Sequence, residues 1–247
     1  MKITRHFGLT LFFFMILSLL PPQMGSALPS PPITNLSPGE GAIVTSPIFI
    51  DAQIRPGQDG LIRVTLLNRD NTAIARQLIK LNAPRDGQQI PFSTSIVFEI
   101  PQEHIQALLT LETQDRFHRP VSLRGVLLTL ESDGEAMVQN QPTTSNWLTI
   151  TSPIEGDSFK GGNFTVEGII TPPTSNPVIF ELITDSGGVI GTSQLAVDEP
   201  GIPSQFNISV TYAFITSRRD VRLIVRQTVN PYGSNIVLDS LPISLSP

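Results

Sequence analysis

The chain has 247 residues, a formal net charge of −5, 40% hydrophobic residues and 15% charged residues. It contains no cysteine, which excludes disulfide bonds, thiolate metal sites, a cysteine nucleophile and lipid attachment through an N-terminal cysteine. The acidic balance excludes the basic electrostatic footprint that nucleic-acid-binding proteins carry.

The N-terminus has the pattern of a secretion signal over residues 1–27. Lys2 and Arg5 form a basic start, an apolar run follows over 9–20, and the small residues Gly25-Ser-Ala27 suit a signal peptidase. An uncleaved membrane anchor is the alternative, although the apolar run is short for a span. Cleavage would leave a net charge of about −7 and no membrane span. Export without cystines favours a bacterial cell envelope or periplasm.

After a proline-rich leader, residues 33–131 are predicted to form a first domain. Runs of Ile, Val, Leu, Phe and Thr between Pro, Gly, Asn and Asp indicate strands. The predicted strands are 48–54, 61–68, 73–81, 94–100, 107–113 and 123–130. One short helical turn is predicted at 101–108, because proline is accepted at a first helical position. Residues 132–146 lack an apolar period and are predicted to be a linker.

Residues 147–247 are predicted to form a second domain. Its predicted strands are 148–151, 163–170, 178–184, 189–197, 205–212, 221–228 and 241–245. Short strands separated by turn signals, with no long amphipathic helix, predict an all-β fold. We expect two tandem immunoglobulin-like antiparallel β-sandwiches after the signal peptide.

A sequence repeat supports the duplication of one unit. Ser37-Pro-Gly-Glu-Gly41 returns as Ser152-Pro-Ile-Glu-Gly156, and residues 62–75 align with 178–191 without a gap. Each aligned segment is predicted to be a hairpin whose turn uses Asn, Asp or Gly, the residues that tolerate positive φ. Chance similarity between two β-rich segments is the alternative, which the shared order of motif, hairpin and strands disfavours.

Three segments of the second copy carry the motifs of a known family. The sequence reads Ile-Thr-Ser-Pro-Ile-Glu-Gly over 150–156, Phe-Thr-Val-Glu-Gly over 164–168 and Phe-Glu-Leu-Ile-Thr-Asp-Ser-Gly over 180–187. In these motifs residues 147–247 resemble the immunoglobulin-like domain of bacterial spore germination proteins. The first copy is a more diverged relative, because it has Asp51-Ala52 where the family has a glycine. The resemblance implies an exported, non-catalytic module of sandwich fold and supplies no catalytic residues.

Few residues suggest chemistry, and we predict no catalytic residue, no cofactor-binding residue and no metal ligand. Glu112, Asp115 and His118 lie close in sequence, but in a strand only Glu112 and His118 would share a face. A polar loop is the preferred interpretation. Asp185 is interpreted as a hairpin-turn residue, since calcium needs several converging oxygens.

Three other features are candidate binding positions. Trp147, the single tryptophan, is interpreted as an inter-domain or edge-packing residue. Tyr232 lies in a predicted hairpin tip and is the better candidate for an exposed ring. Arg222 and Arg226 share strand parity, so they form either a face for an anionic partner or a solvated face paired with acids such as Asp220.

Together these observations predict a non-catalytic exported envelope protein that serves as an interaction or structural module. Its expected partners are other envelope proteins or a cell-wall polymer. A polysaccharide- or peptidoglycan-binding accessory module is the alternative, and it calls for exposed aromatic rings. A hydrolase with a dispersed site is a third hypothesis, and it calls for His104 or His118 hydrogen-bonded to a carboxylate.

Overall fold

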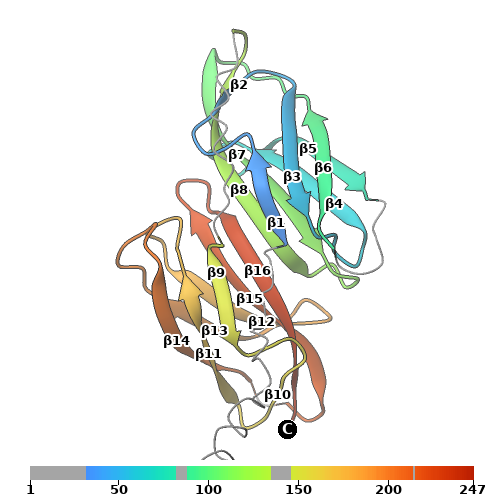
Figure 1. Cartoon of the computed structure of the whole chain (residues 1–247), viewed down its shortest axis with the longest axis vertical. Helices are drawn as coiled ribbons and strands as arrows, with labels where there is room; N and C mark the ends of the chain where they lie inside the picture. Colours follow the sequence, from blue (N-terminus) through green and yellow to red (C-terminus); the bar gives the residue numbers. More distant parts are fainter. Residues whose placement is uncertain (1–31, 82–87, 135–145, 214) are drawn as a thin grey trace, which may run out of the picture.

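The computed structural model describes residues 32–81, 88–134, 146–213 and 215–247 (Figure 1). The predicted signal segment and most of the predicted linker lie outside these residues. No helix in the described part of the chain is long and apolar enough to cross a membrane. The elements of the described ranges are β1 (Ile33–Ser37), β2 (Ile43–Val44), β3 (Ile48–Ile54), β4 (Leu61–Leu67), β5 (Ala73–Lys80), β6 (Ile90–Ile96), β7 (His104–Gln114), β8 (Pro120–Glu131), β9 (Leu148–Ser152), β10 (Ser158–Phe159), β11 (Asn163–Ile170), β12 (Val178–Thr184), β13 (Val189–Leu195), β14 (Ser204–Thr211), β15 (Arg219–Val229) and β16 (Ser234–Leu245).

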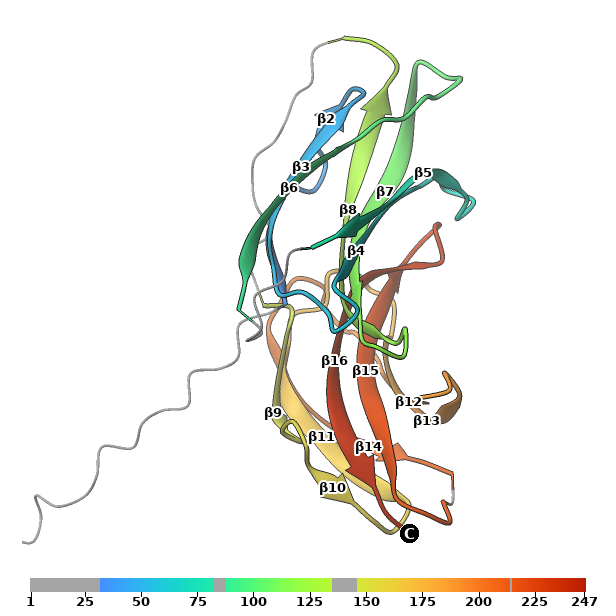
Figure 2. The same ribbon diagram turned by 90° about the vertical axis from the view of Figure 1, so that its right-hand side faces the viewer.

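The strands form a β-sandwich fold, as predicted, in which one large sheet runs through both halves of the chain. We call β1–β8 the N-terminal half and β9–β16 the C-terminal half. The large sheet has ten strands in the order β13-β12-β15-β16-β8-β7-β4-β5, with β10 beside β16 and β2 beside β8. Two three-stranded sheets, β1-β3-β6 and β14-β11-β9, complete the fold. Both lie on the same side of the large sheet (Figure 2). The limits proposed above for two domains and a linker stay predictions.

Alternating side chains explain why these segments are strands. In β11, Phe164, Val166, Gly168 and Ile170 are buried and the residues between them are exposed. The same period of two recurs in β3 and β12, so that one face of each strand packs into a core. Each half has its own main hydrophobic cluster between its two sheets.

Several sequence predictions need correction. The helical turn predicted at 101–108 is wrong, because β7 already begins at His104, which pairs with Glu131 of β8. The strand predicted at 94–100 lies earlier, as β6, and the strand predicted at 241–245 begins seven residues earlier, as β16. Strands β1, β2 and β10 were not predicted.

The repeated Ser-Pro-x-Glu-Gly motifs form equivalent turns in both halves. The glycines Gly41 and Gly156 have φ of 76° and 87°, a conformation that suits glycine. The N–H of Gly41 donates to the carbonyl of Leu127 (2.8 Å), and the N–H of Gly156 donates to the carbonyl of Pro242 (3.0 Å). Each motif therefore turns the chain onto the last strand of its own half, where β2 or β10 pairs in parallel.

Pairing between β8 and β16 joins the halves. The two strands are antiparallel, and Leu123 is the partner of Leu238 at the centre of the paired stretch. These leucines form a small cluster with Ile224 on one face of the sheet. On the other face, Arg124 and Asp239 form an ion pair of 2.7 Å between the halves.

Trp147 completes this contact. Its side chain is 4% exposed, and its Nε1–H donates to Asp239 Oδ2 over 2.7 Å. Because Asp239 is also paired with Arg124 of the other half, Trp147 packs at the junction of the two halves.

Steric hindrance explains the glycine of the Val-x-Gly strand, and this explanation can be tested. A Cβ on Gly168 would lie 2.1 Å from the carbonyl oxygen of Thr149, so Gly168→Ala is expected to lower the free energy of unfolding by about 1–3 kcal/mol. Chemical denaturation measures this change. Gly188→Ala is the control, because the nearest atom to its Cβ is 3.4 Å away, and we expect a change within about 0.5 kcal/mol. Equal stabilities of the two variants would contradict the steric explanation.

Candidate functional site

Two hairpin tips hold the halves together, and each rests on the large sheet of the other half. The tip between β15 and β16 packs against the N-terminal half. There Tyr232 is 3% exposed and shares a hydrophobic cluster with Leu67 and Leu108. Ser234 of the same tip hydrogen-bonds to Asn71. The prediction that Tyr232 is an exposed ring at a hairpin tip is therefore wrong, because the tip is covered by the other half.

The tip between β7 and β8 packs against the C-terminal half through charges. Asp115 is completely buried, and its Oδ2 accepts hydrogen bonds from Arg119 Nε (2.8 Å) and Arg222 Nε (3.2 Å). Its Oδ1 accepts from the backbone N–H groups of Phe117 and Arg119. Arg119 and Arg222 are each 6% exposed. Arg222 also donates to Ser240 Oγ, which in turn donates to the carbonyl of Val121.

The two contacts occupy equivalent places in the repeat. Leu67 and Leu108 are cross-strand partners on β4 and β7. Ile183 and Arg222 are cross-strand partners on β12 and β15, at the aligned positions of the second copy. At these equivalent positions, Leu108 packs against the β15–β16 tip by apolar contact, whereas Arg222 holds the β7–β8 tip through an ion pair with Asp115.

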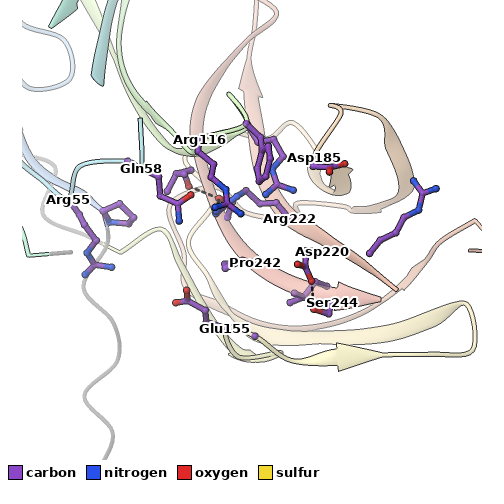
Figure 3. Close-up of a pocket in the computed structure, with 18 of the residues that line it drawn as sticks. Arg55, Gln58, Arg116, Glu155, Asp185, Asp220, Arg222, Pro242 and Ser244 are labelled. Atoms are coloured by element: carbon purple, nitrogen blue, oxygen red, sulfur yellow. Dashed lines mark hydrogen bonds between the residues drawn. The ribbon is translucent and has the colours of Figure 1, made fainter. Parts of the chain in front are cut away.

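A groove opens beside the charged contact. It has a volume of about 1040 Å³ and combines loops of both halves with the outer face of β15 and β16. Figure 3 shows Arg116 and Arg222 near its centre, with Arg55 and Gln58 on one side and Asp185 on the other. In the part of the chain that the structure describes, its charged lining consists of six arginines and three carboxylates, namely Arg55, Arg116, Arg119, Arg218, Arg219, Arg222, Glu155, Asp185 and Asp220.

The arginines are concentrated and partly fixed. The whole chain has 16 Lys and Arg residues and 21 Asp and Glu residues, so this groove reverses the overall acidic balance. Arg116 lies over the ring of Phe117, with 4.7 Å between its Cζ and the ring centroid. Arg218 donates to Ser244 Oγ (3.1 Å), which donates to Asp220 Oδ1 (2.7 Å). Arg116, Arg218 and Arg219 are exposed, and these are the side chains that a solute would meet.

Burial and hydrogen bonding act in opposite directions on Asp115. Burial alone would raise the pKa of its carboxyl group, but the hydrogen bonds from Arg119 and Phe117 and the charge of Arg119 together hold that pKa below its ordinary value. Burial lowers the pKa of Arg222, which Asp115 opposes. Asp115 therefore stays ionised and orients both buried guanidinium groups.

The other residues considered from the sequence do not form a site. Glu112 lies in β7, whereas His118 is exposed in the tip with φ of 61°. His104 is exposed at the start of β7. Among the described residues, no group of three or more His, Asp or Glu side chains is placed to hold a metal ion. Asp185 lies in the β12–β13 turn, as interpreted, at the rim of the groove.

Arg222 and Arg226 have different ion-pair partners although they share strand parity. Arg226 pairs with Glu181 through two hydrogen bonds of 3.0 and 2.8 Å, whereas Arg222 pairs with Asp115 from the other half. Arg226 is absent from the lining of the groove, whereas Arg222 lines it together with Arg218 and Arg219 at the start of β15.

No protein-family model matches the chain, and no curated protein matches it. Among solved structures, the chain is similar to CBD12 from CALX1.2, with 10% identity and a TM-score of 0.22, over 85% of this chain and 99% of that one. It is also similar to the CFA/I adhesin CfaE of enterotoxigenic E. coli, with 9% identity and a TM-score of 0.22, over 90% of this chain and 83% of that one. At these identities and TM-scores neither structure supplies a residue correspondence or a function.

Removal of the buried carboxylate tests the charged contact. Asp115→Ala is expected to lower the free energy of unfolding by about 3–5 kcal/mol at pH 7, because Arg119 and Arg222 would keep buried charges without a partner. Since the pKa of Asp115 is lower in the folded than in the unfolded protein, its stabilisation is present above the unfolded value of about 3.9 and is lost as the pH falls through the folded pKa. Denaturation curves at several pH values should therefore show the two proteins converging in acid.

Two further variants make this result specific. Asp198→Ala, at an exposed carboxylate, should change stability by no more than about 0.5 kcal/mol. Asp115→Val combined with Arg119→Leu and Arg222→Leu imitates the leucine contact and should recover most of the loss. An Asp115→Ala protein as stable as wild type at pH 7 would show that the ionic contact does not hold the tip.

Proposed function

We propose that the protein is a non-catalytic, exported interaction module of the bacterial cell envelope that binds an anionic partner in the groove between its halves. The observation that carries this proposal is the gathering of six arginines from both halves in one groove of an acidic protein. Arginine forms paired, charge-assisted hydrogen bonds with carboxylate and phosphate groups, which suits it to capture anions.

The architecture supports binding with little reorganisation. The groove lies on a sheet that continues through both halves, so its loops are fixed relative to one another by strand pairing. A preformed site avoids part of the entropy cost of ordering loops and side chains when a partner binds. The signal-like N-terminus and the resemblance to exported sandwich modules support the envelope location.

The titratable groups favour binding over catalysis. His104 and His118 are both exposed, and Asp115, the buried carboxylate nearest the groove, is occupied by two arginines. A carboxylate with a lowered pKa that is held in ion pairs is a poor general base at neutral pH. Among the described residues, neither histidine nor Asp115 is therefore placed as a general base, and the arginines of the groove offer charge recognition.

Charge reversal in the groove tests the proposal. Arg218→Glu combined with Arg219→Glu places two negative charges among the exposed arginines, so binding of the purified protein to isolated envelope should weaken about tenfold or more, roughly 1.4 kcal/mol. Co-sedimentation measures the bound fraction. Binding of the wild type should also fall as salt rises, because screening weakens exposed charges.

A matched variant controls for net charge. Arg76→Glu combined with Lys80→Glu changes the total charge equally on β5, at the far edge of the large sheet, and should leave binding unchanged. Equal losses in the two double variants would refute the groove as the binding surface. N-terminal sequencing of the protein from the extracytoplasmic fraction should begin at Leu28, and an uncleaved cytoplasmic chain would refute export.

A further inference from the structure

We propose that the partner in the groove is an anionic glycan, a sugar polymer that carries phosphate or carboxylate groups along its chain. This inference rests on the proposed function and names the chemical class of the partner. It follows from three observations, which concern the charged contact, the paired backbone and the positions of the aromatic rings.

The charged contact is the first observation. At the equivalent place in the repeat, Leu67 and Leu108 receive the opposite tip by apolar packing. The fold therefore does not need a buried arginine at position 222. Desolvation of Arg222 and Arg119 carries a cost that an apolar contact avoids, which indicates a role for their charge beyond holding the tip. Both line the groove, where Asp115 cancels only one of their two charges and fixes their direction.

The exposed arginines extend this positive surface. Arg218 is held by the hydroxyl of Ser244, and Arg116 is stacked on Phe117, so these guanidinium groups are restrained before any partner arrives. The groove volume of about 1040 Å³ lies just above the range of about 300–1,000 Å³ for small-molecule sites, which leaves room for several linked units of a polymer. A chain with repeated anions would engage several of these arginines at once.

The paired backbone favours a glycan over an acidic peptide. The groove floor is the face of β15 and β16, and β15 is hydrogen-bonded to β12 on one side and to β16 on the other. An extended peptide that adds to a sheet needs a free strand edge, which β15 lacks from Val221 to Gln227, the stretch that is paired on both sides. Gln58 and Ser217 add neutral polar side chains that can hydrogen-bond to sugar hydroxyls, whereas the hydroxyls of Ser240 and Ser244 already bond within the protein.

The positions of the aromatic rings indicate that charge dominates recognition. Trp147 and Tyr232, the rings that would stack on a neutral sugar, are both buried at the junction. Phe117 is 40% exposed in the groove but is already covered on one side by Arg116. A neutral polysaccharide would therefore find little stacking surface here, whereas an anionic one would be held by the arginines.

Binding of defined polymers tests the inference. Fluorescein-labelled phosphorylated dextran and polygalacturonate separate the phosphate source from the carboxylate source, and unmodified dextran and poly-L-glutamate are the neutral and the peptide comparison. We expect the purified wild-type protein to bind at least one of the two anionic glycans at least tenfold more tightly than dextran and poly-L-glutamate by fluorescence anisotropy. The double variant Arg218→Glu with Arg219→Glu should lose at least tenfold of that affinity, and Arg76→Glu with Lys80→Glu should lose less than twofold.

The outcomes separate this inference from the function on which it rests. Equal binding of poly-L-glutamate would overturn the assignment to a glycan, and equal binding of dextran would overturn recognition by charge. Failure of both anionic glycans, with envelope binding still sensitive to the Arg218 and Arg219 changes, would overturn the ligand class and leave the groove as an anion site. Loss of both polymer and envelope binding from the wild type would overturn the proposed function itself.

Discussion

Pairing of β8 with β16 is the constraint on which the rest of the structure depends. Strand β2 covers β8 only at Thr129 and Leu130, so the edge of β8 near Leu123 would otherwise expose unpaired N–H and C=O groups. Strand β16 meets the same edge from the other half, because β10 covers it only at Ser244 and Leu245. The paired stretch is short, yet it merges two five-stranded surfaces into one sheet and brings each hairpin tip onto the neighbouring half.

The two tip contacts have equivalent positions in the repeat, but one is apolar and the other is ionic. The contact around Leu108 gains mainly from apolar burial, whereas the contact around Arg222 must offset the desolvation of two guanidinium groups and one carboxylate. It does so by filling the positions around Asp115 with four hydrogen bonds, two from backbone and two from side chains. Stability alone does not favour the ion-pair contact over the apolar one, whereas the charged groove beside Arg222 gives a reason for buried arginines at this position.

Local patterns in the sequence predict the fold better than they predict the site. Alternation predicted the exact bounds of β3, β11 and β12, because each strand buries one face in its own half. The turn at 101–108 was wrong because pairing with β8 overrides a weak local preference. Tyr232 was misplaced because turn composition carries no information on what covers a tip. The sequence did contain a signal of a buried partner, because Arg222 is a lone charge in an otherwise apolar run from Val221 to Val225. The partner itself could not be identified from local pattern, since Asp115 lies 107 residues away.

The two copies of the repeat differ in the contact that the motif glutamate makes, and this difference affects the groove. In the N-terminal half, the carboxylate of Glu40 accepts the N–H of Leu127, and burial raises its pKa. The aligned position of Leu127 is Pro242, which has no N–H to donate, so Glu155 cannot form this bond and lies in the groove instead. Glu155, Asp185 and Asp220 thus interrupt the arginines with negative charge. In the proposed binding, the anions of a partner lie on the arginines and its neutral groups lie beside these carboxylates, so the carboxylates contribute to specificity by repelling misplaced anions.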